Sequence, residues 1–274
     1  MLEVAAVFAL LEALRMAPGV AELQRWETRA LGASYFAGLL MVAVPVAAVV
    51  VSKGSLEDYG LSVPRWAPAL ARGLIGYIWL LAPNLVLFIA GVYGLGVASM
   101  PVSLLVSGVT LLALLMVLRR LASPGPPRPR RDLALLVLLV ASPLAVSSLA
   151  GSLSPRLVST LIWELVFGGA AEEVLYRGYV QGRVNEEFGR PWRLRGVPFG
   201  PGLLVSSALY GVAGALGAAP RLGLGGLSLA VGVHGVALGL FYGFMREATG
   251  DVGASSVANG LNDAVGGLLL RAVS

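Results

Sequence analysis

Two adjacent glutamates and an arginine, Glu172, Glu173 and Arg177, lie inside one of the long apolar stretches of this sequence. An ionised side chain at bilayer depth costs about 2.5–3.5 kcal/mol even on the scales that assign it the smallest cost. Three such side chains this close together need a reason beyond packing. Intramembrane charges are functional more often than structural, so this segment is the first candidate site. The alternative is a buried ion-pair network that only orients helices.

Helical spacing divides the two glutamates between two roles. Glu173 and Arg177 are four residues apart and would share one helix face, which predicts an ion pair between them. Glu172 would instead share a face with Tyr176 and Tyr179, and so would remain available to a cavity. A carboxylate in such a cavity can act as a general base in hydrolysis.

The composition is that of a polytopic helical membrane protein. Of the 274 residues, 57% are hydrophobic and only 13% are charged, whereas a soluble domain carries about 25% charged residues. Apolar runs of about 20 residues, the length that crosses a bilayer, recur along the chain. We therefore expect an all-α fold with seven or eight transmembrane helices.

Two scarce residue types exclude several chemistries. Cysteine is absent, which rules out disulfides and thiolate nucleophiles, and His234 is the single histidine. With that histidine, the carboxylates of Glu172, Glu173 and Asp263 form a poor ligand set for zinc, so no metal and no cofactor are expected. The net charge of +5 does not indicate nucleic-acid binding, because the arginines cluster in short loops between apolar runs, as in membrane proteins.

The apolar runs also give the domain organisation. Residues 1–16 do not resemble a signal peptide, and we expect a short first span or an interfacial helix within residues 1–32. Residues 33–274 are expected to form a single transmembrane domain. In the helix that carries the two glutamates, Gly168 and Gly169 predict a break or a close packing point. The predicted helices cover residues 33–52, 70–98, 101–118, 133–150, 154–183, 199–219, 226–246 and 252–272.

Two basic segments set the expected topology. The linker 119–131 is predicted to be too rich in proline for a helix, and the segment 183–195 is predicted to be a basic loop. Alternation of the spans places both on one side of the bilayer. By the positive-inside rule this side is the cytoplasmic face of the cell membrane. The linker could also attract anionic lipid of the bilayer.

Three sequence motifs resemble one known family. The pattern Glu-Glu-x-x-x-Arg followed by Gly-Tyr-Val resembles the first motif of the CAAX protease and bacteriocin-processing (Abi) family, which includes the type II CAAX prenyl endopeptidases. The loop SLEDYGL at residues 55–61 and the segment GLFYGFMREATG at residues 239–250 also resemble that family. The resemblance covers about residues 35–272, with a protease-like core at about 130–272. It implies a conical intramembrane cavity and hydrolysis of a peptide or prenylated-protein tail near the membrane face.

The resemblance also implies site residues. It carries over Glu172 as the base that activates water, with Glu173 and Arg177 completing the first motif. In the second motif, Tyr210 stands where phenylalanine is expected and Gly214 where histidine is expected.

The third motif departs from the family in the same way. Asn259 replaces its histidine, while Asp263 matches its last position. Glycine cannot transfer a proton, and asparagine can donate a hydrogen bond to an oxyanion but cannot act as an acid or base. Loss of one such group costs about 10²–10⁴ in rate. Asp263 could also share a proton with Glu172, as acid proteases do.

The function is therefore open between two main alternatives. One is an active glutamate-type endopeptidase, with Tyr176, Tyr210 and His234 as accessory groups. His234 would then replace a missing motif histidine, although its simplest interpretation is a hydrogen-bonded interior residue. The other is a catalytically silent relative that binds a membrane protein partner, peptide or lipid. A transporter is a third hypothesis, but no inverted repeat supports it.

Overall fold

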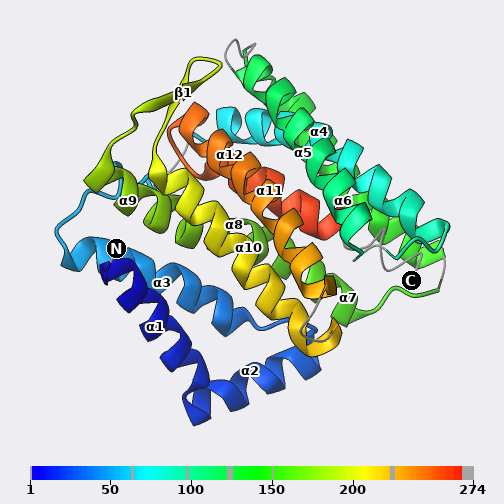
Figure 1. Cartoon of the computed structure of the whole chain (residues 1–274). Coiled ribbons are helices and arrows are strands. Elements are labelled where there is room, and N and C mark those ends of the chain that lie inside the picture. Colours follow the sequence, from blue (N-terminus) through cyan, green and yellow to red (C-terminus); the bar gives the residue numbers. More distant parts are fainter. Residues whose placement is uncertain are drawn as a thin grey trace.

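The structure is a computed structural model that describes residues 2–62, 65–96, 99–121, 126–149, 151–222 and 226–266. Its elements form a helical bundle with one small hairpin (Figure 1). The first six helices are α1 (Leu2–Met16), α2 (Pro18–Leu31), α3 (Tyr35–Val51), α4 (Trp66–Val92), α5 (Met100–Leu121) and α6 (Pro129–Leu149). A long composite helix follows, consisting of α7 (Pro155–Trp163), η1 (Glu164–Gly168), α8 (Gly169–Glu173), η2 (Val174–Val180) and α9 (Gln181–Phe188). The remaining elements are β1 (Trp192–Leu194), β2 (Val197–Phe199), α10 (Pro201–Leu222), α11 (Gly226–Thr249), α12 (Gly253–Leu261) and η3 (Asn262–Gly266).

The helical class and the apolar spans are confirmed, but seven or eight spans are not. Within the described residues, α4, α5, α6 and the part of α11 from Ser228 are long and apolar enough to cross a membrane. The pair α1 and α2, bent by 72°, adds a fifth span if it is counted as one. The helices α3 and Pro201–Gly217 are apolar but shorter.

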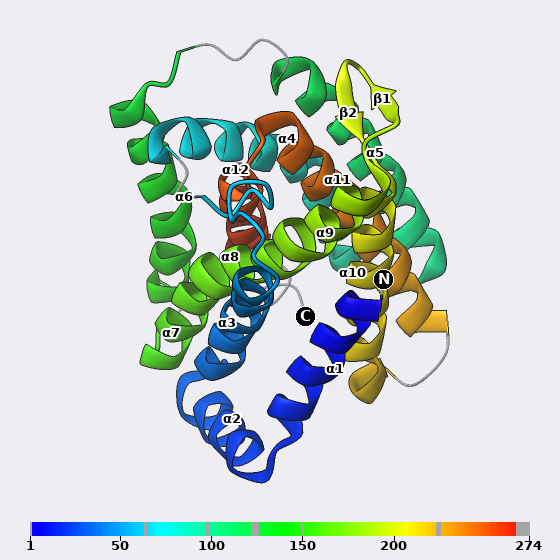
Figure 2. The same ribbon diagram turned by 90° about the vertical axis from the view of Figure 1, so that its left-hand side faces the viewer.

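The composite helix α7–α9 is tilted across the molecule, between α3 and α12 (Figure 2). Its contact with α12 depends on the absence of side chains. A Cβ atom at Gly169 would lie 2.8 Å from the Cα of Gly260, and a Cβ at Gly260 would lie 2.6 Å from the carbonyl oxygen of Leu165. Small residues let helix backbones approach closely in membranes. The predicted packing point is therefore at Gly169, and it brings the following glutamates against α12.

Gly169→Ala is expected to destabilise the protein by about 1–3 kcal/mol, because the new methyl group overpacks the contact with Gly260. Thermal unfolding in detergent measures the change. Gly108→Ala is the matched control, since a Cβ there meets nothing within 4 Å and alanine is the better helix former. Equal unfolding temperatures for the two variants would contradict the close contact.

The two glutamates are flanked by π-helical segments. Segment η1 precedes α8 and η2 follows it, so the side-chain spacing is no longer that of an α-helix. The prediction that Tyr179 shares a face with Glu172 is wrong for this reason. The hydroxyl of Tyr179 instead donates to Glu3 at 3.3 Å, and its ring stacks on Tyr59 with centroids 6.4 Å apart.

The segment 183–195 is not simply a loop. Helix α9 extends to Phe188, and the antiparallel strands β1 and β2 form a hairpin. Its turn residues Arg195 and Gly196 both have positive φ, 49° and 85°, as tight hairpin turns require. The adjacent Arg195 and Gly196 are the feature of the sequence that could have indicated this turn.

The prediction for the linker 119–131 is also wrong in part. Arg119 and Arg120 lie in the last turn of α5, and α6 begins at Pro129, because proline is tolerated in the first helical turn. The hairpin and the adjoining ends of α5 and α6 lie at the same end of the bundle (Figures 1 and 2). Which side of the membrane this end faces stays a prediction.

The loop between α3 and α4 is fastened to the same end. The hydroxyl of Tyr59 donates to Glu186 at 2.7 Å, and Arg246 donates to the carbonyl of Asp58 at 3.2 Å. Burial, with the Glu186 carboxylate nearby, raises the pKa of Tyr59 to about 12, so its hydroxyl remains a donor. The backbone N–H of Val252 also donates to the carbonyl of Gly60. The loop thus joins α9, α11 and α12.

Candidate active site

Glu172 lies at a cavity that is lined by five parts of the chain: α1, α3, the composite helix, α10 and α11. The composite helix contributes Glu172 and Tyr176 to this cavity of about 410 Å³, and α10 contributes Tyr210 and Gly214. His234 enters the same cavity wall from α11. The other lining residues are mostly apolar. The structure therefore brings together four residues selected from the sequence and the glycine that replaces a motif histidine.

Glu172 is held at one of its two carboxylate oxygens. Its Oε2 accepts a hydrogen bond from the hydroxyl of Tyr210 at 2.9 Å and one from Nδ2 of Asn259 at 3.3 Å. Its Oε1 accepts no hydrogen bond from any described residue, and this atom is not buried. The side chain is half-buried at the cavity wall. One oxygen is therefore fixed while the other remains accessible.

Glu173 and Arg177 form the ion pair that their spacing predicts. Nη1 of Arg177 lies 3.2 Å from Oε1 of Glu173, and both side chains are 0% exposed. None of the three guanidinium nitrogens makes a well-aligned hydrogen bond with a described residue. The guanidinium carbon instead lies 4.3 Å from the centre of the Tyr210 ring and 5.4 Å from that of Tyr242. Aromatic faces therefore share the stabilisation of this buried cation.

Tyr210 consequently serves two partners. Its ring lies against Arg177, which a phenylalanine could also do, while its hydroxyl binds Glu172. The substitution that looked like a departure from the second motif thus adds the shorter of the two hydrogen bonds to the candidate base. The sequence predicts Tyr210 as an accessory group but not its hydrogen bond to Glu172, although the extra hydroxyl in that motif was a signal for it.

Asn259 lies between the two carboxylates. Its Nδ2 donates to Oε2 of Glu172 and to Oε1 of Glu173, each at 3.3 Å, and the side chain is fully buried. The amide is therefore engaged with both glutamates in this structure, rather than free to meet an oxyanion as its motif position suggested.

His234 lies on the cavity wall, but not as a fully hydrogen-bonded interior residue. Its Nδ1 atom is buried and has no partner among the described residues. Gly214 lines the same cavity, and a Cβ added there would meet only Val231, at 3.8 Å. The position of the missing second-motif histidine is therefore open space beside His234.

Asp263 and Tyr176 are placed differently. Asp263 lies on η3 within electrostatic range of Glu172, but no hydrogen bond joins these two carboxyl groups in the part of the chain that the structure describes. Its Oδ1 accepts from Asn262 at 3.5 Å. Tyr176 packs edge-on against Tyr210, with centroids 5.2 Å apart, and lines the cavity.

The described residues contain no cluster of three or more histidine, aspartate or glutamate side chains able to hold a metal ion.

The comparisons with known proteins point to one family. Residues 154–265 match the model described as type II CAAX prenyl endopeptidase Rce1-like. This segment contains every residue of the site discussed above. A search of curated proteins and a search of solved structures gave no significant match.

Proposed function

Because residues 154–265 belong to the Rce1-like family of type II CAAX prenyl endopeptidases, we propose that this integral membrane protein is an intramembrane glutamate-type endopeptidase. It hydrolyses a peptide bond near the membrane face, with Glu172 as general base. The observation that carries the proposal is the state of this carboxylate. Two donors hold Oε2, and Oε1 is accessible at a cavity.

The reaction follows general-base chemistry. Oε1 of Glu172 takes a proton from a water molecule, and the resulting hydroxide attacks the carbonyl carbon of the scissile peptide bond. A tetrahedral oxyanion forms. When the C–N bond breaks, the protonated carboxyl group returns its proton to the leaving nitrogen. Water thus supplies the hydroxyl group of the new acid and a hydrogen of the new amine.

The neighbouring groups divide the remaining work. Tyr210 and Asn259 are positioning residues, because both bind the carboxylate oxygen that does not take the proton. Arg177 neutralises Glu173, so that a second unpaired charge does not oppose ionisation of the base. His234 and Tyr176 line the cavity and are the groups that we assign to stabilise the oxyanion. Asp263 contributes to the electrostatic environment from η3.

The substrate that we propose is a peptide or a prenylated protein tail. A second hollow of about 490 Å³ lies among α1, α3, η2 and α10 and has a mainly apolar lining. It shares Tyr176 and Met41 with the site cavity, so an apolar group attached to the peptide would have a place beside the scissile bond.

For the location we propose the cell membrane, with the hairpin end of the bundle in the cytoplasm. The support is the positive-inside rule, applied to the arginines of segments 119–131 and 183–195, which gather at that end.

A catalytically silent binding or regulatory protein is the second candidate. It is favoured by one observation, the open space at Gly214 where the family pattern has histidine. Such a protein would keep the cavity to hold a peptide or a membrane protein partner without cleaving it.

The test is proteolysis by the full-length protein in liposomes, with a peptide library that includes prenylated tails. Mass spectrometry in ¹⁸O-labelled water identifies cleavage, because one labelled oxygen enters each new carboxylate. Labelled products support the endopeptidase. Binding of library peptides without any labelled product supports the silent alternative.

Restoring the second-motif histidine is expected to raise activity. Gly214→His places an imidazole in the open space beside His234 and Glu172, and an added acid–base group should raise kcat/KM by about tenfold or more. Gly214→Leu fills the same space without a titratable group and is the matched control. If both variants change kcat/KM equally, the space does not belong to the reaction.

A further inference from the structure

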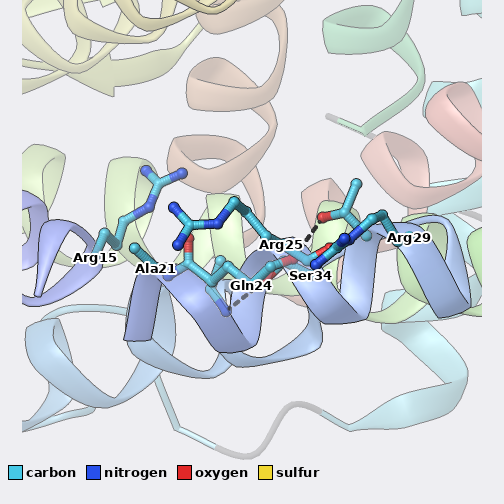
Figure 3. A pocket seen from close by; sticks show the side chains of 8 residues that line it. Arg15, Ala21, Gln24, Arg25, Arg29 and Ser34 are labelled. Atoms are coloured by element: carbon cyan, nitrogen blue, oxygen red, sulfur yellow. Dashed lines mark hydrogen bonds between the residues drawn. The ribbon is translucent and has the colours of Figure 1, made fainter. Parts of the chain in front are cut away.

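A third hollow lies where α1, α2 and the start of α3 meet. These parts of the helices lie at the end of the bundle opposite the hairpin (Figures 1 and 2). The hollow measures about 740 Å³ and is open to the surroundings. Three arginines line it, Arg15 at the end of α1 and Arg25 and Arg29 on α2 (Figure 3). The family match begins at residue 154, so this hollow belongs to a part of the chain to which that match assigns nothing.

The hollow offers donors without matching acceptors. The guanidinium of Arg25 has no ion pair or hydrogen bond with any described residue, and the only bond of the Arg29 guanidinium is from Nε to the carbonyl of Arg25. Nε2 of Gln24, which also lines the hollow, is buried and has no hydrogen-bond partner among the described residues. No aspartate or glutamate is among the lining residues. Such a lining selects a group that only accepts hydrogen bonds and carries negative charge.

The nearby acids do not satisfy these donors. Glu12 pairs with Arg15 at 3.0 Å from an exposed position on α1. Glu27 is turned toward the start of α3, where it accepts from the hydroxyl of Ser34 at 2.8 Å and from the backbone N–H of Phe36 at 3.1 Å. Both acids are thus engaged, and among the described residues neither Arg25 nor Arg29 forms an ion pair.

The hollow adjoins the site cavity. Arg15 and Ala37 line both, so the two hollows share a wall at these residues. This shared wall favours a negatively charged part of the substrate itself over a separate lipid molecule.

We propose that Arg15, Arg25 and Arg29 bind a carboxylate of the substrate peptide while its scissile bond lies at Glu172. This inference rests on the proposed endopeptidase activity. The carboxylate is either the C-terminus or an acidic side chain, because both present the same planar pair of acceptors to guanidinium groups. The arginine hollow thus selects peptides that carry a negative charge on one side of the cleaved bond.

The test uses the full chain in phosphatidylcholine liposomes with three forms of one cleavable peptide. They are the free acid, the C-terminal amide, and the amide with each acidic side chain replaced by its carboxamide. Wild type is expected to cleave the form that retains the bound carboxylate about tenfold to a hundredfold better in kcat/KM, mainly through KM. If the free acid is cleaved better than the C-terminal amide, the bound group is the C-terminal carboxylate. If cleavage falls only when the acidic side chains are replaced, the bound group is a side-chain carboxylate.

Arg25→Gln/Arg29→Gln removes two exposed charges and is expected to abolish this preference, so that the variant cleaves the three peptide forms equally well. Arg156→Gln is the matched control. Arg156 is also exposed and contacts α2 through the carbonyl of Thr28, but it does not line the hollow. Wild-type cleavage without any charge preference overturns the inference and leaves the endopeptidase standing.

If no peptide is cleaved, binding of the same three peptides to Glu172→Gln is measured instead. A carboxylate preference that disappears in the added Arg25→Gln/Arg29→Gln background supports the hollow as a peptide site, and equal binding of all three overturns it. Displacement by phosphatidylglycerol liposomes, with equal binding of the three peptides, would assign the hollow to a lipid headgroup.

Discussion

Glu172→Gln is expected to lower kcat for peptide cleavage by about 10²–10⁴-fold while the protein stays folded. Glutamine has the same shape as glutamate, and its carbonyl oxygen can still accept from Tyr210 and Asn259. It cannot take a proton from water. The measurement is kcat at saturating peptide in liposomes, together with the unfolding temperature in detergent.

Two further variants sharpen this result. Tyr210→Phe keeps the ring against Arg177 and removes only the hydroxyl on Glu172, so a smaller loss of kcat is expected than for Glu172→Gln. Glu57→Gln changes an exposed glutamate in the loop before α4 and should leave kcat unchanged. A Glu172→Gln protein that keeps kcat within a factor of about two would remove Glu172 from the reaction, since a lost base costs far more.

Arg177→Met is expected to destabilise the folded protein by about 3–5 kcal/mol, because it leaves the Glu173 carboxylate buried without its partner. The contact with the Tyr210 ring is lost as well. Denaturant unfolding in detergent micelles measures the change. Arg183→Met is the control, since Arg183 also pairs with glutamates but is 33% exposed, and exposed pairs contribute only about 0–1 kcal/mol.

A double variant separates the charge effect from the loss of packing. Arg177→Met combined with Glu173→Gln removes both charges, and it should be more stable than Arg177→Met alone. Comparison with both single variants should give a coupling energy of about 0.5–3 kcal/mol. Strictly additive losses would show that the ion pair does not stabilise the bundle.

The sequence predicts contacts of the site between residues that are close along the chain, but not contacts between residues that are far apart. The Glu173–Arg177 pair follows from a four-residue spacing within one helix, and the structure has it at 3.2 Å. The donors to Glu172 come from α10 and α12, 38 and 87 residues away. No local pattern encodes those contacts, because they depend on how three helices pack. The place of His234 on the cavity wall follows from packing in the same way.

The errors in the fold also have local causes. The wrong face is predicted for Tyr179 because π-helical turns change the spacing of side chains around the helix. They do so without changing the hydrophobic composition, so the sequence does not reveal them. The hairpin was missed because two three-residue strands are too short for an alternating pattern. By contrast, the prediction of a break or a close packing point at Gly168 and Gly169 is confirmed as close packing at Gly169, since small residues let helix backbones approach.

The most direct test of the account compares wild type with Glu172→Gln, side by side, in the labelled-water proteolysis assay. Wild type is expected to give products that carry one ¹⁸O atom, and Glu172→Gln at least about a hundredfold fewer of them. Equal amounts of labelled product from the two proteins would contradict the assignment of Glu172 as the base.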